Sequence, residues 1–250
     1  MQRLLILGGT MEATALAQAL PTDRWIGILS LAGRTRQPMT SPAILRQGHF
    51  GGVDGLVNFL KTERIDAVVD ATHPFAAQIS RQAAIATHHC QIPYLMLVRP
   101  AWEPQEGDRW LTVPDLAAAA AILPDLAQRI FLTTGRQSLA PFVALKEQWF
   151  LMRILEPTPP ELLLPPGEVL CDRPPFTLAH ELDLLQHYRI QALVTKNSGG
   201  TATCAKLMAA RQHNIPIVMI ERPVLPEGDR VSTVAAALKW LEQQAYKQES

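Results

Sequence analysis

Short apolar runs alternate with helix-like segments along the whole chain. The first pair is an apolar run at residues 4–7 followed by a helical segment at 11–20. Runs that are apolar throughout are typical of strands buried on both faces, as in parallel sheets covered by helices. The pattern therefore predicts an α/β fold with a mainly parallel sheet.

The same alternation places the other elements. In the first hundred residues we expect strands at 4–7, 25–29, 67–70 and 94–98, a short strand near 44–47, and helices at 11–20, 53–63 and 74–88. Further along we expect strands at 130–133, 150–155, 192–195 and 217–220, and helices at 115–123, 178–187, 202–212 and 234–246.

The segment 99–108 interrupts this rhythm with two prolines, a glycine and clustered charges, which indicates a linker. We therefore expect two smaller α/β domains with a cleft between them. The first would span residues 1–100 and the second residues 101–250, and the last helix could pack on either.

Composition narrows the class of protein. The chain has 250 residues, and its 23 basic and 23 acidic residues give a formal net charge of zero, so neither nucleic acid nor a membrane surface is an expected partner. Cys90, Cys171 and Cys204 lack the spacing of a zinc site or a disulfide framework. The run at 4–7 is too short for a signal peptide, and no run approaches the roughly 20 apolar residues of a membrane span. We expect a cytoplasmic protein.

A glycine turn follows the first strand. Gly8, Gly9 and Thr10 join this strand to a helix with Glu12 in its first turn. Glycines at this place let the backbone approach a pyrophosphate, whose charge the helix amides can hold. The segment lacks the full GxGxxG spacing, and a Gly-Gly turn can also serve only to reverse the chain.

The end of the second strand indicates which dinucleotide would bind. Enzymes that prefer NAD carry an acidic residue there for the ribose hydroxyls. Here Ser30, Gly33, Arg34, Thr35 and Arg36 occupy the place, with two arginines and no acid. Guanidinium groups suit a phosphate, so NADPH is favoured over NADH. The alternative is a solvated basic loop; the missing acid also argues against a methyltransferase that uses S-adenosylmethionine.

Thr72, His73 and Pro74 follow the buried strand at 67–70. Proline fits the first turn of a helix and makes the preceding residue extended, so a helix is expected to begin at Pro74. Thr72 and His73 would then lie at the carboxyl end of a strand, where ligands of open α/β sheets bind. His73 titrates in a range that suits proton donation, but a histidine there can equally cap a helix.

Two strand ends in the second half are also polar. Thr134, Gly135 and Arg136 follow one strand, and the turn after the strand at 192–195 contains Lys196, Asn197, Ser198, Gly199, Gly200 and Thr201. Successive amides of a Ser-Gly-Gly-Thr turn can form an anion site, to which a lysine adds a charge. The sequence is not a Walker loop, so ATP hydrolysis is not expected.

Six motifs occur in a fixed order: GGTMEA at 8–13, SLAGRT at 30–35, GHFGGV at 48–53, DATHPFA at 70–76, TTGRQ at 133–137 and TKNSGGTAT at 195–203. Together they resemble the precorrin-6A reductase family of cobalamin biosynthesis, which includes reductases of the cobalt-bearing substrate. The resemblance extends to about residue 223, and DATHPFA and TKNSGG are its most specific pieces. It departs at 47–51, where QGHFG replaces the family's usual Gly-Gly-Phe-Gly-Gly.

The resemblance implies two Rossmann-like parallel-sheet domains, with NADPH bound by residues 1–100 and the substrate on the side of residues 101–250. The activity would be NADPH-dependent reduction of a ring double bond of precorrin-6A or cobalt-precorrin-6A to the dihydro form; NADH is the alternative cofactor. The implied cofactor residues are Gly8, Gly9, Thr10, Glu12, Ser30, Gly33, Arg34, Thr35, Thr72, His73 and Pro74. The implied substrate residues are Thr134, Gly135, Arg136, Lys196, Asn197, Ser198, Gly199, Gly200 and Thr201. His73 and Lys196 are the candidate catalytic residues, with bound water as a further proton donor.

A non-catalytic dinucleotide-binding redox sensor is the competing hypothesis, although it would not need the second polar edge at 195–203. A short-chain reductase would carry a Tyr-x-x-x-Lys pair, and no lysine follows Tyr94, Tyr188 or Tyr246 at that spacing. The pair His88-His89 has no acid at metalloprotease spacing, so no metal is expected. The sequence does not fix the oligomeric state, and a monomer is compatible with it.

Overall fold

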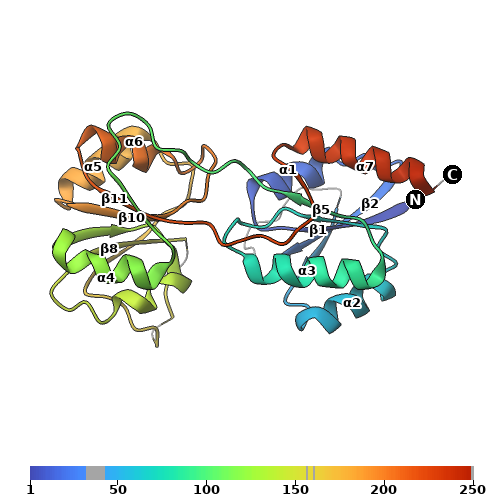
Figure 1. Ribbon diagram of the computed structural model, residues 1–250, viewed down its shortest axis with the longest axis horizontal. Helices are drawn as coiled ribbons and strands as arrows, with labels where there is room; N and C mark the ends of the chain where they lie inside the picture. Colours follow the sequence, from blue (N-terminus) through green and yellow to red (C-terminus); the bar gives the residue numbers. More distant parts are fainter. Residues whose placement is uncertain (32–42, 156, 160, 249–250) are drawn as a thin grey trace. The chain divides into compact units, whose positions relative to one another are not determined.

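The chain folds into two compact units in the computed structural model, which describes residues 1–31, 43–155, 157–159 and 161–248 (Figure 1). Unit 1 consists of Met1–Pro100 and Pro223–Ser250, and unit 2 consists of Ala101–Arg222. In the described residues, each unit has a six-stranded sheet whose strands pair in parallel. Parallel sheets with helices between their strands confirm the predicted α/β fold.

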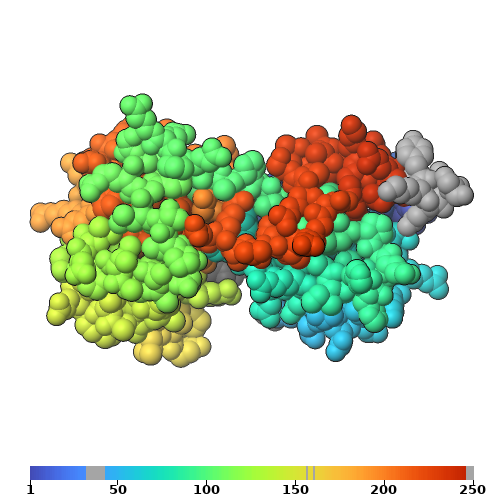
Figure 2. Space-filling model, viewed as in Figure 1, coloured from blue at the N-terminus to red at the C-terminus, as the bar shows by residue number. Residues whose placement is uncertain are grey.

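Unit 1 is a sheet between two layers of helices. Its strands are β1 (Gln2–Leu7), β2 (Trp25–Leu31), β3 (Ile44–Gln47), β4 (Ala67–Asp70), β5 (Tyr94–Leu97) and β12 (Asp229–Val231), and its helices are α1 (Met11–Ala19), α2 (Gly52–Thr62), α3 (Ala77–Cys90) and α7 (Val234–Gln248). The strand order is β12-β5-β4-β1-β2-β3. Helices α1 and α7 cover one face and α2 and α3 the other (Figure 1). Figure 2 shows α7, in red, on the surface of unit 1.

The central strand β1 faces both helix layers. Leu4 and Ile6 pack with residues of α1 and α7, whereas Leu5 and Leu7 pack with residues of α2 and α3. Successive side chains of a strand point to opposite faces, so a strand covered on both sides must be apolar throughout. Burial of each such side chain contributes about 1.5–3 kcal/mol, which makes β1 an anchor of this unit.

Unit 2 has the same kind of architecture. Its strands are β6 (Trp110–Val113), β7 (Arg129–Leu132), β8 (Trp149–Ile154), β9 (Gly167–Cys171), β10 (Ala192–Lys196) and β11 (Ile217–Ile220), its α-helices are α4 (Leu116–Leu126), α5 (Leu178–His187) and α6 (Ala205–Gln212), and two 3₁₀ helices are η1 (Arg136–Ser138) and η2 (Ala140–Phe142). The strand order is β6-β11-β10-β7-β8-β9. Helices α5 and α6 cover the sheet face that holds Phe131 and Leu193, and α4 covers the other (Figure 1).

The two sheets share one strand order when strands are matched by connectivity. β1, β2 and β3 correspond to β7, β8 and β9, and β4 and β5 correspond to β10 and β11. In each sheet the first three of these strands lie side by side in chain order, and the next two are added on the other side of the first of them. The order therefore reverses between β1 and β4 and between β7 and β10. Ligands of open α/β sheets bind at the carboxyl ends of strands at such a reversal, so the fold marks these two edges as candidate sites.

At one edge of each sheet, the last strand comes from a part of the chain that is distant in sequence from its neighbour. β6 follows β5 in sequence but pairs with β11, and β12 follows β11 but pairs with β5. Helix α7 continues from β12 and buries Trp240 and Leu241 in the core of unit 1. The domain expected over residues 101–250 therefore differs from unit 2. Strand pairing of β12 and the apolar face of α7 hold the carboxyl-terminal segment in unit 1.

Three edge strands, β6, β9 and β12, are absent from the sequence-based prediction. Most of their residues are exposed or half-buried. A strand with solvent on one side needs no apolar run, and these three are too short to show a clear alternation. The helix expected at 202–212 begins instead at Ala205, because residues 201–204 form a turn in which Cys204 N donates to Thr201 O at 3.4 Å.

Candidate functional site

The glycine turn lies at the β1/β4 edge of unit 1. Gly8 N donates to Ser30 O at 2.9 Å, and a Cβ at Gly8 would lie only 2.7 Å from Leu29 Cδ1, so the neighbouring strand excludes a side chain. Gly9 has a φ of +111°, which side chains rarely allow, and a Cβ built on it meets nothing within 4 Å. The turn is therefore closed toward β2 and open at Gly9, as close approach of a ligand to the backbone requires.

Thr10 joins the turn to β4. Its hydroxyl donates to Ala71 O at 2.6 Å and accepts from Ala13 N at 3.2 Å, which caps helix α1. The structure thus brings the residues after β1 and those after β4 together at one edge. The proton of the Thr10 hydroxyl is therefore already used in the hydrogen bond to Ala71 O.

Asp70, the last residue of β4, organises the turn that follows it. This buried carboxylate accepts from Thr72 N at 3.0 Å and from the Thr72 hydroxyl at 2.6 Å through Oδ1, and from the Tyr94 hydroxyl at 3.0 Å through Oδ2. Burial and then the Asp70 charge raise the pKa of Tyr94, so it remains a donor. The Thr72 hydroxyl is therefore used within the turn. The sequence reasoning missed Asp70, although an Asp followed two residues later by Thr is a recognised turn signal.

His73 and Pro74 form a turn and not the start of a helix. Phe75 N donates to His73 Nδ1 at 3.2 Å, and Ala76 N donates to His73 O at 2.7 Å. The prediction that a helix begins at Pro74 is wrong, because these local bonds replace helical ones and α3 begins at Ala77. Since Nδ1 accepts a hydrogen bond, the neutral His73 ring carries its proton on Nε2.

Glu12 and Ser30, two other predicted cofactor residues, have protein partners. Glu12 Oε2 accepts from Arg99 Nη1 at 3.0 Å, which fastens the end of the segment where the chain leaves unit 1. Ser30 Oγ accepts from Arg46 Nη1 at 3.1 Å. The remaining predicted residues of this set, Gly33, Arg34 and Thr35, lie outside the described residues.

The β7/β10 edge of unit 2 brings Lys196 to the segment after β7. Lys196 Nζ donates to Ser138 Oγ at 2.6 Å, and burial lowers the pKa of Lys196. The hydroxyl of Thr134 is buried and has no hydrogen-bond partner within the described part of the chain. An unpartnered buried hydroxyl costs about 1–3 kcal/mol, so a polar ligand group that reached it would be favoured. Gly135, at a φ of +84°, leaves open space beside it.

Asn197 holds the segment that enters unit 2. Its Oδ1 accepts from Trp102 N at 2.8 Å and its Nδ2 donates to Trp102 O at 3.0 Å, while Trp102 Nε1 donates to Gly200 O at 2.8 Å. Arg222, at the end of unit 2, donates to Asn197 O at 2.8 Å and to Ser198 O at 3.1 Å. The side chain of Asn197 is thus engaged in shaping the turn.

Apart from Arg136, the remaining residues of the predicted substrate set belong to this turn. Gly199 and Gly200 have φ values of +69° and +78°, a pair of left-handed residues for which glycine is the suitable choice. Thr201 is exposed. Arg136, in η1, donates to Pro157 O at 3.2 Å, which connects it to the proline-rich loop before β9.

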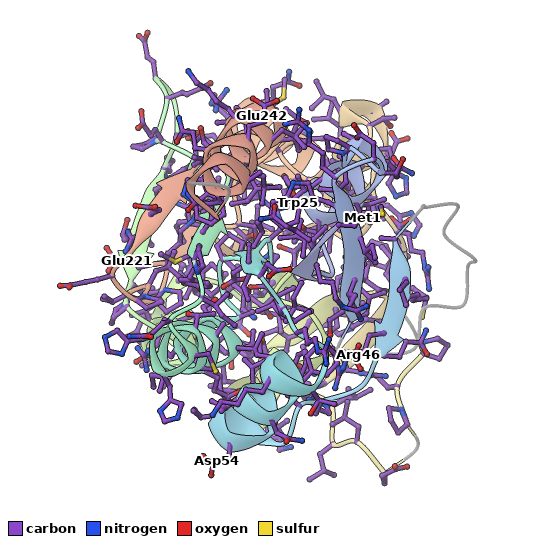
Figure 3. All side chains as sticks on the ribbon, turned by 90° about the vertical axis from the view of Figure 1, so that its right-hand side faces the viewer. Met1, Trp25, Arg46, Asp54, Glu221 and Glu242 are labelled. Carbon is purple, nitrogen blue, oxygen red and sulfur yellow. The ribbon has the colours of Figure 1, made fainter. Side chains whose placement is uncertain are left out.

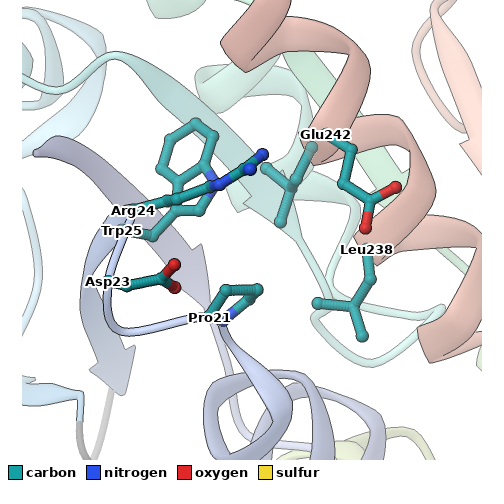
Figure 4. A pocket seen from close by; sticks show the side chains of 7 residues that line it. Pro21, Asp23, Arg24, Trp25, Leu238 and Glu242 are labelled. Carbon is teal, nitrogen blue, oxygen red and sulfur yellow. The ribbon is translucent and has the colours of Figure 1, made fainter.

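A cavity in unit 1 lies elsewhere. Pro21, Asp23, Arg24 and Trp25 line one side and Leu238 and Glu242 of α7 the other (Figure 4). Trp25 begins β2, so the cavity is at the amino end of that strand, away from the glycine turn.

Among the described residues, no cluster of His, Cys, Asp and Glu could hold a metal ion, and no described helix is long and apolar enough to cross a membrane.

Comparison with known proteins agrees with this arrangement. The family described as precorrin-6x reductase CbiJ/CobK matches residues 3–242. A precorrin-6A reductase of Rhodococcus erythropolis is 50% identical over 96% of this chain and 98% of its own, and a cobalt-precorrin-6A reductase of Synechocystis is 30% identical over 87% of each chain. The solved structure of CobK precorrin-6A reductase covers 98% of this chain and 97% of its own, with a TM-score of 0.90 and 42% identity. The chain belongs to the precorrin-6x reductase family.

Proposed function

We propose that this protein reduces a ring double bond of precorrin-6A to the dihydro (6B) form, with NADPH as hydride donor. The observation that carries the proposal is the glycine turn at the β1/β4 reversal of unit 1, in a chain of a reductase family. This is where an open α/β sheet binds a dinucleotide. NADH is the alternative donor.

The residues at this edge fit a dinucleotide. The backbone at Gly9 is open to close approach, and within the described residues no side chain caps the first amides of α3. Amides at a helix start and at a glycine turn can together hold a pyrophosphate. The backbone of Gly8 to Thr10 and the turn at Thr72 and His73 would hold the cofactor. When bound, NADPH supplies the hydride, and the protein's part is to position it and the substrate.

The β7/β10 edge of unit 2 suits an acidic substrate. The acetate and propionate groups of the macrocycle are carboxylates, and this edge offers Lys196, Arg136, the unpartnered hydroxyl of Thr134 and the backbone of the turn at 198–201. Charge-assisted hydrogen bonds to carboxylates are stronger than neutral ones. We assign substrate anchoring to these groups.

Reduction of the double bond also needs a proton on the carbon next to the one that takes the hydride. Lys196 suits this role because its lowered pKa brings it nearer to neutral pH, where proton transfer is more efficient. His73 is the second candidate, since its proton lies on Nε2 when Nδ1 accepts from Phe75. Bound water is the third.

The metal-free substrate is the better match. A relative named precorrin-6A reductase is 50% identical to this chain, whereas one named cobalt-precorrin-6A reductase is 30% identical. The test is anaerobic NADPH oxidation with precorrin-6A and with its cobalt complex, offered separately. Faster turnover of the metal-free substrate is expected. NADPH binding without turnover of either would favour the redox sensor.

A further inference from the structure

Arg46 and Ser30 are cross-strand partners at the edge of unit 1 where a dinucleotide's ribose would lie. Arg46 of β3 is in register with Ser30 of β2, and its Nη1 donates to Ser30 Oγ at 3.1 Å. Ser30 is buried near the carboxyl end of β2. In dinucleotide-binding sheets, a residue at this end of the second strand reads the 2′ position of the adenosine ribose.

Within the described residues, the guanidinium of Arg46 is held in place without an acidic partner. It lies 3.7 Å from the centre of the Phe50 ring and 5.0 Å from that of Phe59 in α2, the helix that also carries the labelled Asp54 (Figure 3). In the part of the chain that the structure describes, Arg46 forms no ion pair with a carboxylate, and the sequence from 25 to 53 contains no Asp or Glu. Burial lowers the pKa of Arg46, as expected for a partly desolvated cation. A guanidinium that has lost part of its hydration is stabilised by an anion that binds beside it.

We infer that Arg46 is a specificity-determining residue that selects the 2′-phosphate of NADPH against the 2′-hydroxyl of NADH. This inference rests on the proposed function and deepens it. The contact with Ser30 directs the guanidinium to the end of β2, and stacking on Phe50 fixes its plane. An acidic residue, which would favour the ribose hydroxyls of NADH and repel a phosphate, is missing from this stretch.

A structural role would give different results. Arg46 also donates to Gly48 O at 2.5 Å and to His49 O at 3.0 Å, so it fastens the turn after β3. If that were all it did, its loss would weaken every adenine nucleotide alike. Selection of the 2′-phosphate requires that only ligands with that phosphate lose affinity.

The experiment is calorimetric titration of the full chain with adenosine 2′,5′-bisphosphate and with AMP. Arg46→Met should raise the Kd of the bisphosphate about tenfold or more, because charge-assisted hydrogen bonds are lost, and leave that of AMP within about twofold. Arg46→Lys, which keeps the charge but not the planar fork, should fall between. Arg81→Gln, which removes a positive charge from an exposed position of α3, is the matched control and should change neither.

Equal losses for both ligands, or no loss for the bisphosphate, would overturn the inference. So would a wild-type protein that does not distinguish the two ligands. None of these results touches the reductase activity, which NADPH and NADH oxidation with precorrin-6A tests separately. Turnover of wild type with an unchanged NADPH preference in Arg46→Met would refute the role of Arg46 and leave the proposed function standing.

Discussion

The Tyr94 hydroxyl donates to the Asp70 carboxylate at 3.0 Å across neighbouring strands, and the other oxygen of that carboxylate holds Thr72. A residue of β5 thereby fixes the turn that carries His73. The Tyr94 hydroxyl also lies 3.3 Å from Ser80 O in α3, so its single proton is shared between two acceptors of which the carboxylate is nearer. The geometry of the proposed cofactor edge thus depends on a side chain that does not itself lie in a recognised motif.

Tyr94→Phe should weaken cofactor binding without altering substrate binding. It removes one of the donors to a buried carboxylate, at a cost of about 1–3 kcal/mol, and loosens the turn at Thr72 and His73. We expect the KM for NADPH to rise severalfold while the KM for the tetrapyrrole stays within about twofold. Steady-state kinetics with each reactant varied in turn is the measurement. Tyr188→Phe in unit 2 is the control, and equal effects of the two variants would contradict the role of Tyr94.

Lys196→Met should act on the substrate. It removes the ammonium that donates to Ser138 and that we assign to a substrate carboxylate. The loss of one charge-assisted hydrogen bond predicts a rise of about tenfold or more in the KM for the tetrapyrrole, with the NADPH KM unchanged. Lys146→Met, at an exposed position of the same unit, controls for loss of charge. A shift of both Michaelis constants by the same factor would count against this assignment.

The lowered pKa of Lys206 leads us to predict how the free energy of unfolding depends on pH. This lysine of α6 is buried, and burial followed by the positive charge of Arg153 lowers its pKa to about 7, whereas Glu181 raises it. An unfolded lysine titrates near 10.4, so between about pH 7 and 10 the unfolded chain binds a proton that the folded protein does not. The free energy of unfolding should therefore rise with pH in this window, by up to about 1.4 kcal/mol per pH unit, and be flat with respect to this group below it.

Denaturant unfolding of wild type and Lys206→Met at pH 6.5, 8 and 9.5 measures the effect. The difference in unfolding free energy between the two proteins should change with pH above 7, because the variant cannot release this proton. Lys239→Met, exposed on α7, should keep the wild-type slope. Parallel pH profiles for wild type and Lys206→Met would show that the buried lysine does not titrate in this window.

Asn197→Leu should destabilise unit 2. The change removes both side-chain hydrogen bonds to the backbone of Trp102 and leaves its N–H and C=O to find water. We expect a loss of about 1–3 kcal/mol. Asn197→Asp, which can still accept from Trp102 N but cannot donate to Trp102 O, should lose less. Thermal unfolding compares the two variants, and an equal loss would mean that the bond accepted from Trp102 N, which only Asn197→Asp retains, contributes nothing.

The interior of the fold could be predicted because its signal is local. The runs at 4–7, 67–69 and 192–194 are apolar because both sheet faces are covered, and each lies within a strand of the structure. The pairing of β6 with β11 and of β12 with β5 could not be predicted, because no short-range pattern tells an edge strand which sheet to join. Such pairings depend on contacts between residues far apart in sequence.

The sequence predicted where the turns of the candidate site lie in the fold better than it predicted the hydrogen-bond partners of their residues. The glycine turn and the Thr72–His73 turn were expected at one edge and lie there, joined by Thr10 and Ala71. The partners of Asp70 and Lys196 were not foreseen, because Tyr94 and Ser138 come from other segments and only the fold brings them near. The helix start at Pro74 failed for a local reason, since the side chain of His73 accepts the Phe75 amide and stabilises a turn instead.

The most direct test of the proposed activity follows the hydride itself. Precorrin-6A would be incubated anaerobically with the protein and with NADPH that carries deuterium at one or the other face of the nicotinamide C4. The molecular mass of the tetrapyrrole product would then be measured by mass spectrometry. We predict a product that has gained two hydrogens, one of which is deuterium with one of the two labelled forms. A tetrapyrrole of unchanged mass, recovered from protein that demonstrably binds NADPH, would contradict the reductase assignment.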